Sequence, residues 1–197
     1  MDPKQFRFYC QAGNLGMIRE VLADLSPALR EEYLRSVLQM PLRSDVLEYL
    51  GSEVTRLSVE QGTAILVELL YSEEAAARNL AIELFPAFGE ASLRVLQSHA
   101  GDMDPDVRLF VVQAMLHLPF KEEVVRTLSK QLRVERESNV MVAIVEALGD
   151  MGAGPAEAEA IRDAVEAYDH PYVRFVGERA LRRLGWERRA VPGGERS

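Results

Sequence analysis

The sequence contains one cysteine, Cys10, and no long apolar run. A single cysteine forms no intramolecular disulfide and supplies no cysteine-rich metal site, which suits the reducing cytosol. No apolar stretch approaches the ~20 residues that cross a bilayer, and the opening Met-Asp-Pro-Lys lacks the basic and apolar regions of a signal peptide. We therefore expect a cytoplasmic protein without a membrane partner.

Motifs for catalysis and cofactor binding are also missing. The three histidines, His99, His117 and His170, have no neighbouring glutamate and no His-x-x-x-His spacing. The sequence also lacks Cys-x-x-Cys and the phosphate-binding Gly-x-x-x-x-Gly-Lys pattern. We interpret the glycine-rich stretch 149–154 as a turn between helices, and Cys10 as a buried thiol on the first helix. These absences predict a protein that is not an enzyme and needs no metal or other cofactor.

Acidic residues outnumber basic ones, 31 to 23, which gives a net charge of −8. An acidic surface disfavours non-specific binding to nucleic acid. The exception is residues 174–197, which carry seven arginines and three glutamates. We interpret this segment as the cationic end of the last helix, with a phosphate-binding or acidic-partner patch as the alternative.

Residues 104–119 show the pattern around which the rest of the chain is organised. Asp104 is a favourable N-cap residue, and Pro105 suits the first helical turn. Apolar residues then follow at spacings of four, three and four, which is one face of an α-helix. These residues are Val107, Val111, Ala114 and Leu118.

The same pattern returns at a nearly constant spacing. Segments beginning at Ala75, Glu137 and His170 align with it, so that positions 78, 108, 141 and 174 step by 30, 33 and 33 residues. The terminators Gly89, Pro119, Gly152 and Gly185 step identically. A period of this size is typical of a solenoid, in which stacked helix pairs bury their apolar faces against one another. The predicted first helices of the pairs are residues 58–71, 91–99, 121–134 and 155–168.

The motifs Asp-Pro-Asp-Val-Arg at 104–108, His-Pro-Tyr-Val-Arg at 170–174 and Ala-Leu-x-x-Leu-Gly ending at Gly185 resemble HEAT repeats. The likeness is greatest to the short bacterial type first described in phycobilisome lyases, and it covers residues 58–185. Two features depart from it: Met141 replaces the usual arginine, and residues 72–89 lack the Asp-Pro opening. We expect the aligned Asp and Arg residues, at 104, 108, 169 and 174, to cap helices and pair with the neighbouring repeat.

The resemblance and the helix signals together predict an all-α fold, a right-handed α-solenoid of about twelve helices in six stacked pairs. Residues 1–57 are expected to form irregular N-terminal capping pairs, and residues 58–185 four HEAT-like repeats in the same continuous domain. The stretch 10–22 also resembles the helix pair of an ankyrin repeat, which is an alternative for the cap. Residues 186–197, rich in proline and glycine, are expected to be a disordered tail, with Trp186 folding back over the last helix.

In HEAT solenoids the second helix of each pair lines the concave face, and the resemblance implies the same here. Helical geometry places one exposed ridge beside the core stripe. The candidate partner-binding residues on this ridge are Glu83, Gln113, His117, Glu146, Asp150, Phe175, Arg179 and Arg183. The apolar row Leu109, Val142 and Phe175 is expected to pack between repeats, with exposure to a partner as the alternative.

These features predict a non-enzymatic scaffold or adaptor that binds another protein or a peptide, rather than a small molecule. An accessory subunit of a lyase-type enzyme, similar to the bilin lyases, is the alternative that the resemblance implies. Nucleic-acid binding through the arginine-rich end is a weaker alternative. The HEAT-like DNA glycosylases need a basic groove and aromatic residues, whereas this chain is acidic and has one tryptophan.

Overall fold

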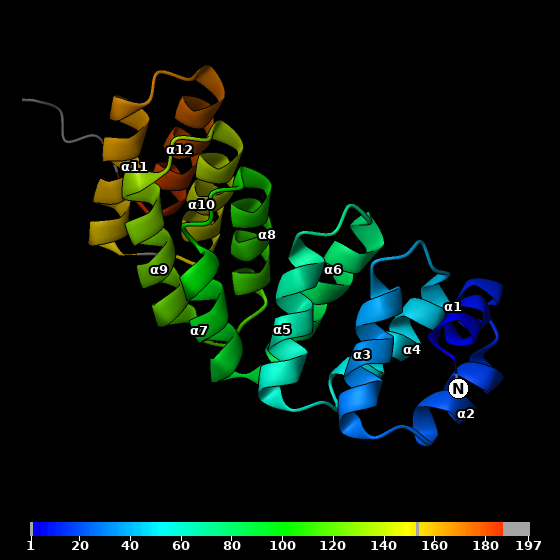
Figure 1. The fold of residues 1–197 in the computed structure, drawn as a ribbon. Coiled ribbons are helices and arrows are strands. Elements are labelled where there is room, and N and C mark those ends of the chain that lie inside the picture. Colours follow the sequence, from blue (N-terminus) through cyan, green and yellow to red (C-terminus); the bar gives the residue numbers. More distant parts are fainter. Residues whose placement is uncertain (1, 153, 187–197) are drawn as a thin grey trace, which may run out of the picture. The chain divides into compact units, whose positions relative to one another are not determined.

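The computed structural model describes residues 2–152 and 154–186, and this part of the chain contains twelve α-helices, one 3-10 turn and no strand (Figure 1). The prediction of an all-α fold with about twelve helices is confirmed. The first six helices are α1 (Pro3–Ala12), α2 (Leu15–Ala23), α3 (Pro27–Leu38), α4 (Ser44–Val54), α5 (Val59–Leu70) and α6 (Ala75–Leu84). The 3-10 turn η1 (Phe85–Phe88) precedes α7 (Glu90–His99), α8 (Pro105–Leu116), α9 (Lys121–Val134), α10 (Ser138–Asp150), α11 (Pro155–Ala167) and α12 (Pro171–Arg183).

Helix starts follow the capping signals of the sequence. The Ser58 hydroxyl accepts a hydrogen bond from the Gln61 amide, and the Gln61 side chain accepts one from the Ser58 amide, both at 3.3 Å. These two reciprocal bonds form a capping box at the start of α5. Asp104 accepts from the Asp106 amide at 2.9 Å and begins α8. At α12 the N-cap is His170, whose ring Nδ1 accepts a hydrogen bond from the Val173 amide. Asp169 was expected to cap this helix and does not.

Helix ends depend on the predicted glycine terminators. Gly89, Gly152 and Gly185 have φ values of 55°, 64° and 67°, which favour glycine because it has no Cβ. After Gly185 the Trp186 amide donates to the Leu181 carbonyl, so the chain turns back onto α12. The α6 segment differs from the prediction, because the helix ends at Leu84 and not at Gly89. The chain continues as the 3-10 turn η1, which contains Pro86, a residue without an N–H to donate to an α-helix. The predicted tail beyond Trp186 lies outside the described residues.

The helices group into two compact units, Met1–Phe120 and Lys121–Ser197. In the first unit, contacts link α1 to α3, α3 to α5, α4 to α6 and α6 to α8, so successive pairs stack. Fully buried side chains such as Phe6, Leu50, Leu66 and Phe85 fill its core. The predicted N-terminal capping pairs therefore share one unit with the first two repeats. The division of the chain at residue 57 stays a prediction.

The second unit contains α9 to α12, in which α9 packs on α11 and α10 packs on α12 (Figure 1). Glycine allows the closest approach between α10 and α12. A methyl group added at Gly149 would lie 2.9 Å from the Ala180 Cβ and 3.2 Å from the Ala180 Cα. Because the Ala180 backbone belongs to a helix, it has little freedom to move away. The α10–α12 contact therefore depends on this pair of small residues.

We expect Gly149→Ala to lower the free energy of unfolding by about 1 kcal/mol, because an overpacking cost of about 1–3 kcal/mol exceeds the gain in helix propensity. The matched control is Gly16→Ala in α2, where the nearest atom to an added methyl is the Asn14 Oδ1 at 3.6 Å. That substitution should leave stability unchanged or raise it. Urea unfolding measures both. A Gly149→Ala protein as stable as wild type would contradict the close-packing argument.

Candidate functional site

The described residues hold no group of three or more His, Cys, Asp or Glu side chains placed to bind a metal ion. No helix among them is long and apolar enough to span a bilayer. Cys10 is fully buried, and its burial raises the pKa of the thiol to about 12. The prediction of a buried thiol at this position is confirmed. A thiol that is protonated and shielded from solvent is a poor nucleophile.

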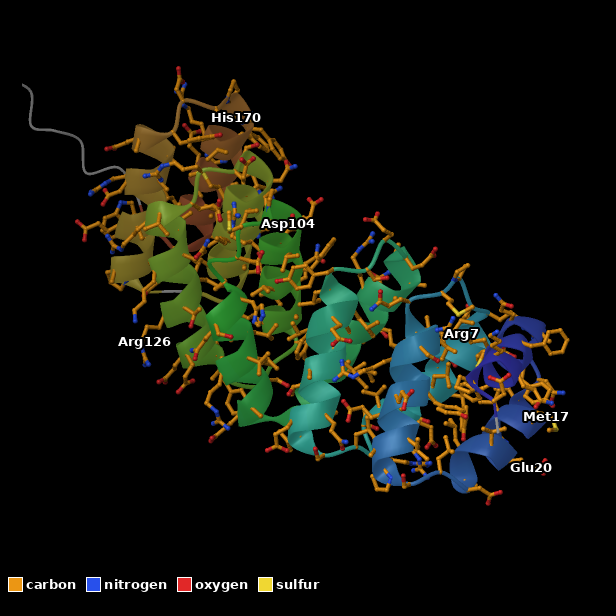
Figure 2. All side chains as sticks on the ribbon, viewed as in Figure 1. Arg7, Met17, Glu20, Asp104, Arg126 and His170 are labelled. Carbon is orange, nitrogen blue, oxygen red and sulfur yellow. The ribbon has the colours of Figure 1, made fainter. Side chains whose placement is uncertain are left out.

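The repeat arginine binds the loop that precedes its own helix. The Arg78 guanidinium donates to the Ser72 carbonyl at 2.6 Å, and Arg108 donates to the Asp102 carbonyl at 2.8 Å. Arg174 pairs with the Asp169 carboxylate at 2.8 Å. The Arg174 pair lies within its own repeat, not with the neighbouring repeat as expected. Figure 2 shows Asp104 and His170 at the starts of the two helices that carry Arg108 and Arg174.

In the repeat that has Met141 in place of the arginine, a different residue donates to the loop carbonyl. Arg136 donates to the Glu135 carbonyl at 2.6 Å, and Glu135 is six residues before Met141, as Ser72 is before Arg78. The Glu135 carboxylate also accepts from the amides of Arg136 and Glu137, at 2.9 and 3.0 Å. Arg136 therefore replaces the missing arginine as the donor to this loop. Met141 is buried instead.

In the first unit, the predicted ridge borders a hollow between α6 and α8. Its volume is about 300 Å³. The lining residues are Asn79, Ile82, Glu83, Gln113, Leu116 and His117. Three predicted partner-binding residues, Glu83, Gln113 and His117, are thus brought together. Two further lining residues, Ile82 and the exposed Leu116, were not among the predicted partner-binding residues. Leu116 is an apolar residue that falls outside the core stripe of its helix, which is the signal that identifies it.

In the second unit, the structure joins four predicted ridge residues in two ion pairs. Arg179 pairs with Glu146, and Arg183 pairs with Asp150, each between α12 and α10. The four side chains remain partly exposed, with 39 to 64 per cent of each accessible. The Phe175 ring lies 5.9 Å from the Arg179 guanidinium, within cation–π range. These charges are therefore already neutralised by one another before any partner binds.

The predicted apolar row does not share one environment. Val142 is 8 per cent exposed, whereas Phe175 is 56 per cent exposed, and Leu109 is half-buried. The expected packing between repeats thus holds for Val142 and not for Phe175. Val142 lies on α10, which packs against α12, and no described helix follows α12. Where α10 buries Val145 and Gly149, the aligned positions of α12 are the exposed Glu178 and Arg182. Phe175 therefore stands on a polar helix face.

The contacts between repeats of the first unit are also polar and aromatic. The Tyr71 hydroxyl donates to the Asp102 carboxylate, and this hydrogen bond raises the pKa of Tyr71 to about 12. The same bond lowers the pKa of Asp102. The Arg78 guanidinium lies 5.0 Å from the centroid of the Phe110 ring, so α6 and α8 are joined by a cation–π contact beside the hollow.

A family model described as HEAT repeats matches residues 93–182. The match runs from the predicted helix 91–99 into the last predicted repeat, and over these residues it confirms the resemblance to HEAT repeats. The likeness to the short bacterial type stays a prediction. The comparisons with curated proteins and with solved structures gave no match.

Cys10 should react with iodoacetamide only when the protein unfolds. At pH 8, a pKa of about 12 against an ordinary 9.0 leaves about a thousandfold less thiolate than in the unfolded chain. Mass spectrometry after timed alkylation, with and without denaturant, measures the two rates. Rapid labelling of the native protein would show that the thiol is accessible.

Arg179→Glu should lower the free energy of unfolding by about 0.5–1 kcal/mol, because it sets a second carboxylate against Glu146 at a partly exposed site. Exchanging both charges, Glu146→Arg with Arg179→Glu, restores the pair and should recover most of the loss. Glu178→Arg, at an exposed site on α12, makes the same charge change as Glu146→Arg and is the control for that half of the exchange. If the double exchange is as unstable as the sum of the single changes, the ion pair contributes nothing.

Proposed function

We propose that the protein is a non-enzymatic cytoplasmic scaffold that binds another protein or a peptide, on the premise that residues 93–182 match the HEAT-repeat family model. HEAT repeats generally mediate protein–protein interaction. The observation that supports a specific binding site is the hollow between α6 and α8. It lies on second helices, where the resemblance to HEAT solenoids places the binding face.

The chemistry of this hollow suits a partner. Ile82 and Leu116 supply apolar surface, and Leu116 is 45 per cent exposed. Around them, the side chains of Asn79, Glu83, Gln113 and His117 are exposed and form no hydrogen bond or ion pair with another described residue. Apolar contact surrounded by open hydrogen-bonding groups is typical of protein interfaces. A peptide lying along α6 and α8 would satisfy these groups and cover Leu116.

The ridge of the second unit offers a different kind of contact. Its charges, Glu146 with Arg179 and Asp150 with Arg183, must give up part of their pairing or be desolvated as pairs when a partner covers them. A partner therefore gains less from these charges than from the unpaired groups of the α6–α8 hollow. We propose that Phe175 supplies the apolar contact on this ridge and that the paired charges set orientation.

Two other functions are the alternatives to a scaffold. One is an accessory subunit of a lyase-type enzyme, which would purify with a coloured or stoichiometric ligand. The other is nucleic-acid binding through residues 174–197, of which 187–197 lie outside the described residues. Binding of that kind would weaken steeply as the salt concentration rises.

A photo-crosslinking residue placed at Gln113 should capture a discrete partner from a lysate of the source organism. The same photo-crosslinking residue placed at Glu32, which is exposed on α3, should not capture this partner. Adding Glu83→Arg to the Gln113 probe should reduce capture about tenfold or more, because it reverses the one carboxylate among the described residues that line the hollow. Gel mobility and mass spectrometry identify the crosslinked protein.

Glu32→Arg is the matched control, since it makes the same charge change on an exposed helical site of the same unit. It should leave capture at Gln113 unchanged. Equal crosslinking from Gln113 and Glu32, or full capture by the Glu83→Arg protein, would place the partner elsewhere. Urea unfolding of each variant separates lost binding from lost folding.

A further inference from the structure

A second hollow, of about 350 Å³, lies in the second unit on the side of the first helices. It opens between α9 and α11, next to the start of α10. The residues that line it include Leu132, Arg133, Arg136, Met141, Ala164 and Tyr168. None of them belongs to the ridge of candidate partner-binding residues, and the site does not depend on the function proposed above.

The floor of this hollow is apolar. Leu132 and Met141 are 1 and 2 per cent exposed, and Ala164 is 9 per cent exposed. The hollow exists for two reasons that are visible in the sequence. Met141 lies where other repeats have an arginine that reaches toward the preceding loop, and three of the α11 residues that line the hollow, Ala160, Ala164 and Ala167, have only a methyl side chain. A volume of this size holds one large apolar side chain or a small organic molecule.

The rim is cationic. Arg133 is exposed and has no hydrogen bond or ion pair with another residue of the described part of the chain. Arg136 donates from Nη1 to the Glu135 carbonyl, and its other guanidinium nitrogens make no such contact there. The described residues of the lining include one carboxylate, Asp163, which pairs with Arg162 at 2.9 Å. Two arginines beside an apolar floor are complementary to a molecule with an anionic head and an apolar body.

We propose that this hollow binds an apolar carboxylate, with the carboxylate on Arg133 and Arg136 and the apolar group over Met141 and Ala164. A free organic acid and the C-terminal apolar residue of a peptide have this chemistry in common. Guanidinium groups bind carboxylates through paired N–H donors, which gives the head group its specificity. The floor excludes water from the apolar group and supplies the remaining affinity.

The first test uses the full chain labelled with ¹³C at the methionine methyl groups. The probes are 3-phenylpropionate and its neutral amide, and a pentapeptide Ala-Ala-Ala-Ala-Phe with a free or amidated C-terminus. Each carboxylate that binds should shift the Met141 methyl resonance, whereas Met103, which is 97 per cent exposed, should not respond. The carboxylate should bind about tenfold more tightly than its amide. The pair that shows this preference identifies whether a free acid or a peptide end is the ligand.

The second test uses variants, with Kd measured by ligand-observed NMR. Arg133→Gln should weaken binding of the carboxylate about fivefold to tenfold. The control is Arg126→Gln on the same helix: Arg126 extends away from the ribbon in Figure 2, does not line the hollow, and its loss should change the Kd less than about twofold. The probe-bound Met141 resonance is assigned with Met141→Leu.

Met141→Arg provides the sharpest discrimination, because it restores the arginine of the other repeats and fills the hollow while adding positive charge. We expect it to weaken carboxylate binding more than about tenfold, since the apolar floor is lost. Attraction by positive charge alone predicts the opposite. Ala164→Leu, which fills the same space with an apolar group, should also weaken binding and serves if Met141→Arg is unstable.

Three results would overturn the proposal. The first is equal affinity for carboxylate and amide. The second is carboxylate binding to the Met141→Arg or Ala164→Leu protein at least as tight as to wild type, with folding confirmed by circular dichroism. The third is a Met141 resonance that does not change at probe concentrations that shift Met103.

Discussion

Each helix pair of this protein has an apolar face that only a neighbouring pair can cover, and the other contacts of the structure depend on that constraint. Stacking sets the distance between equivalent positions, so polar contacts between pairs join residues about one repeat apart. Gln61 contacts Glu31, Arg35 pairs with Glu68, Tyr71 donates to Asp102, and Arg179 and Arg183 pair with Glu146 and Asp150. These bonds do not drive the stacking, since partly exposed ion pairs contribute little. They fix its register, which places the side chains of each surface.

The loop before each second helix shows how a repeat keeps one structural task while changing the residue that performs it. Arg78 and Arg108 donate to a carbonyl six residues earlier, and Arg136 donates to the aligned carbonyl where Met141 has replaced the arginine. A loop carbonyl needs a donor, and the source of that donor is free to change. The exchange has a consequence at the surface of the second unit. The methionine occupies less of the space beside α11, and a hollow with an apolar floor and an arginine rim results.

The two hollows differ in what they can recognise. The α6–α8 hollow combines amides, a carboxylate and an imidazole with exposed Leu116, which suits the mixed surface of a protein or peptide. The α9–α11 hollow combines a buried apolar floor with two guanidinium groups, which suits a single anionic group on an apolar body. The α10–α12 ridge has both signs of charge, but its ion pairs are closed within the unit. Open hydrogen-bonding capacity, more than net charge, distinguishes these surfaces.

The sequence by itself determined the helices, several of their caps and their repeat register. Capping residues, glycine terminators and a period near 33 residues are local or strictly periodic signals, so Asp104 and Gly185 were correctly interpreted without a structure. It also brought Glu83, Gln113 and His117 onto one surface, because equivalent helix positions face the same way. Only the tertiary structure decided which charged residues form ion pairs with one another, which apolar positions are buried, and where the side chains leave a hollow. Val142 and Phe175 occupy the same repeat position, yet one is covered by the next helix and the other is not. Such differences depend on the neighbour that packs against a residue, which its own repeat pattern does not specify.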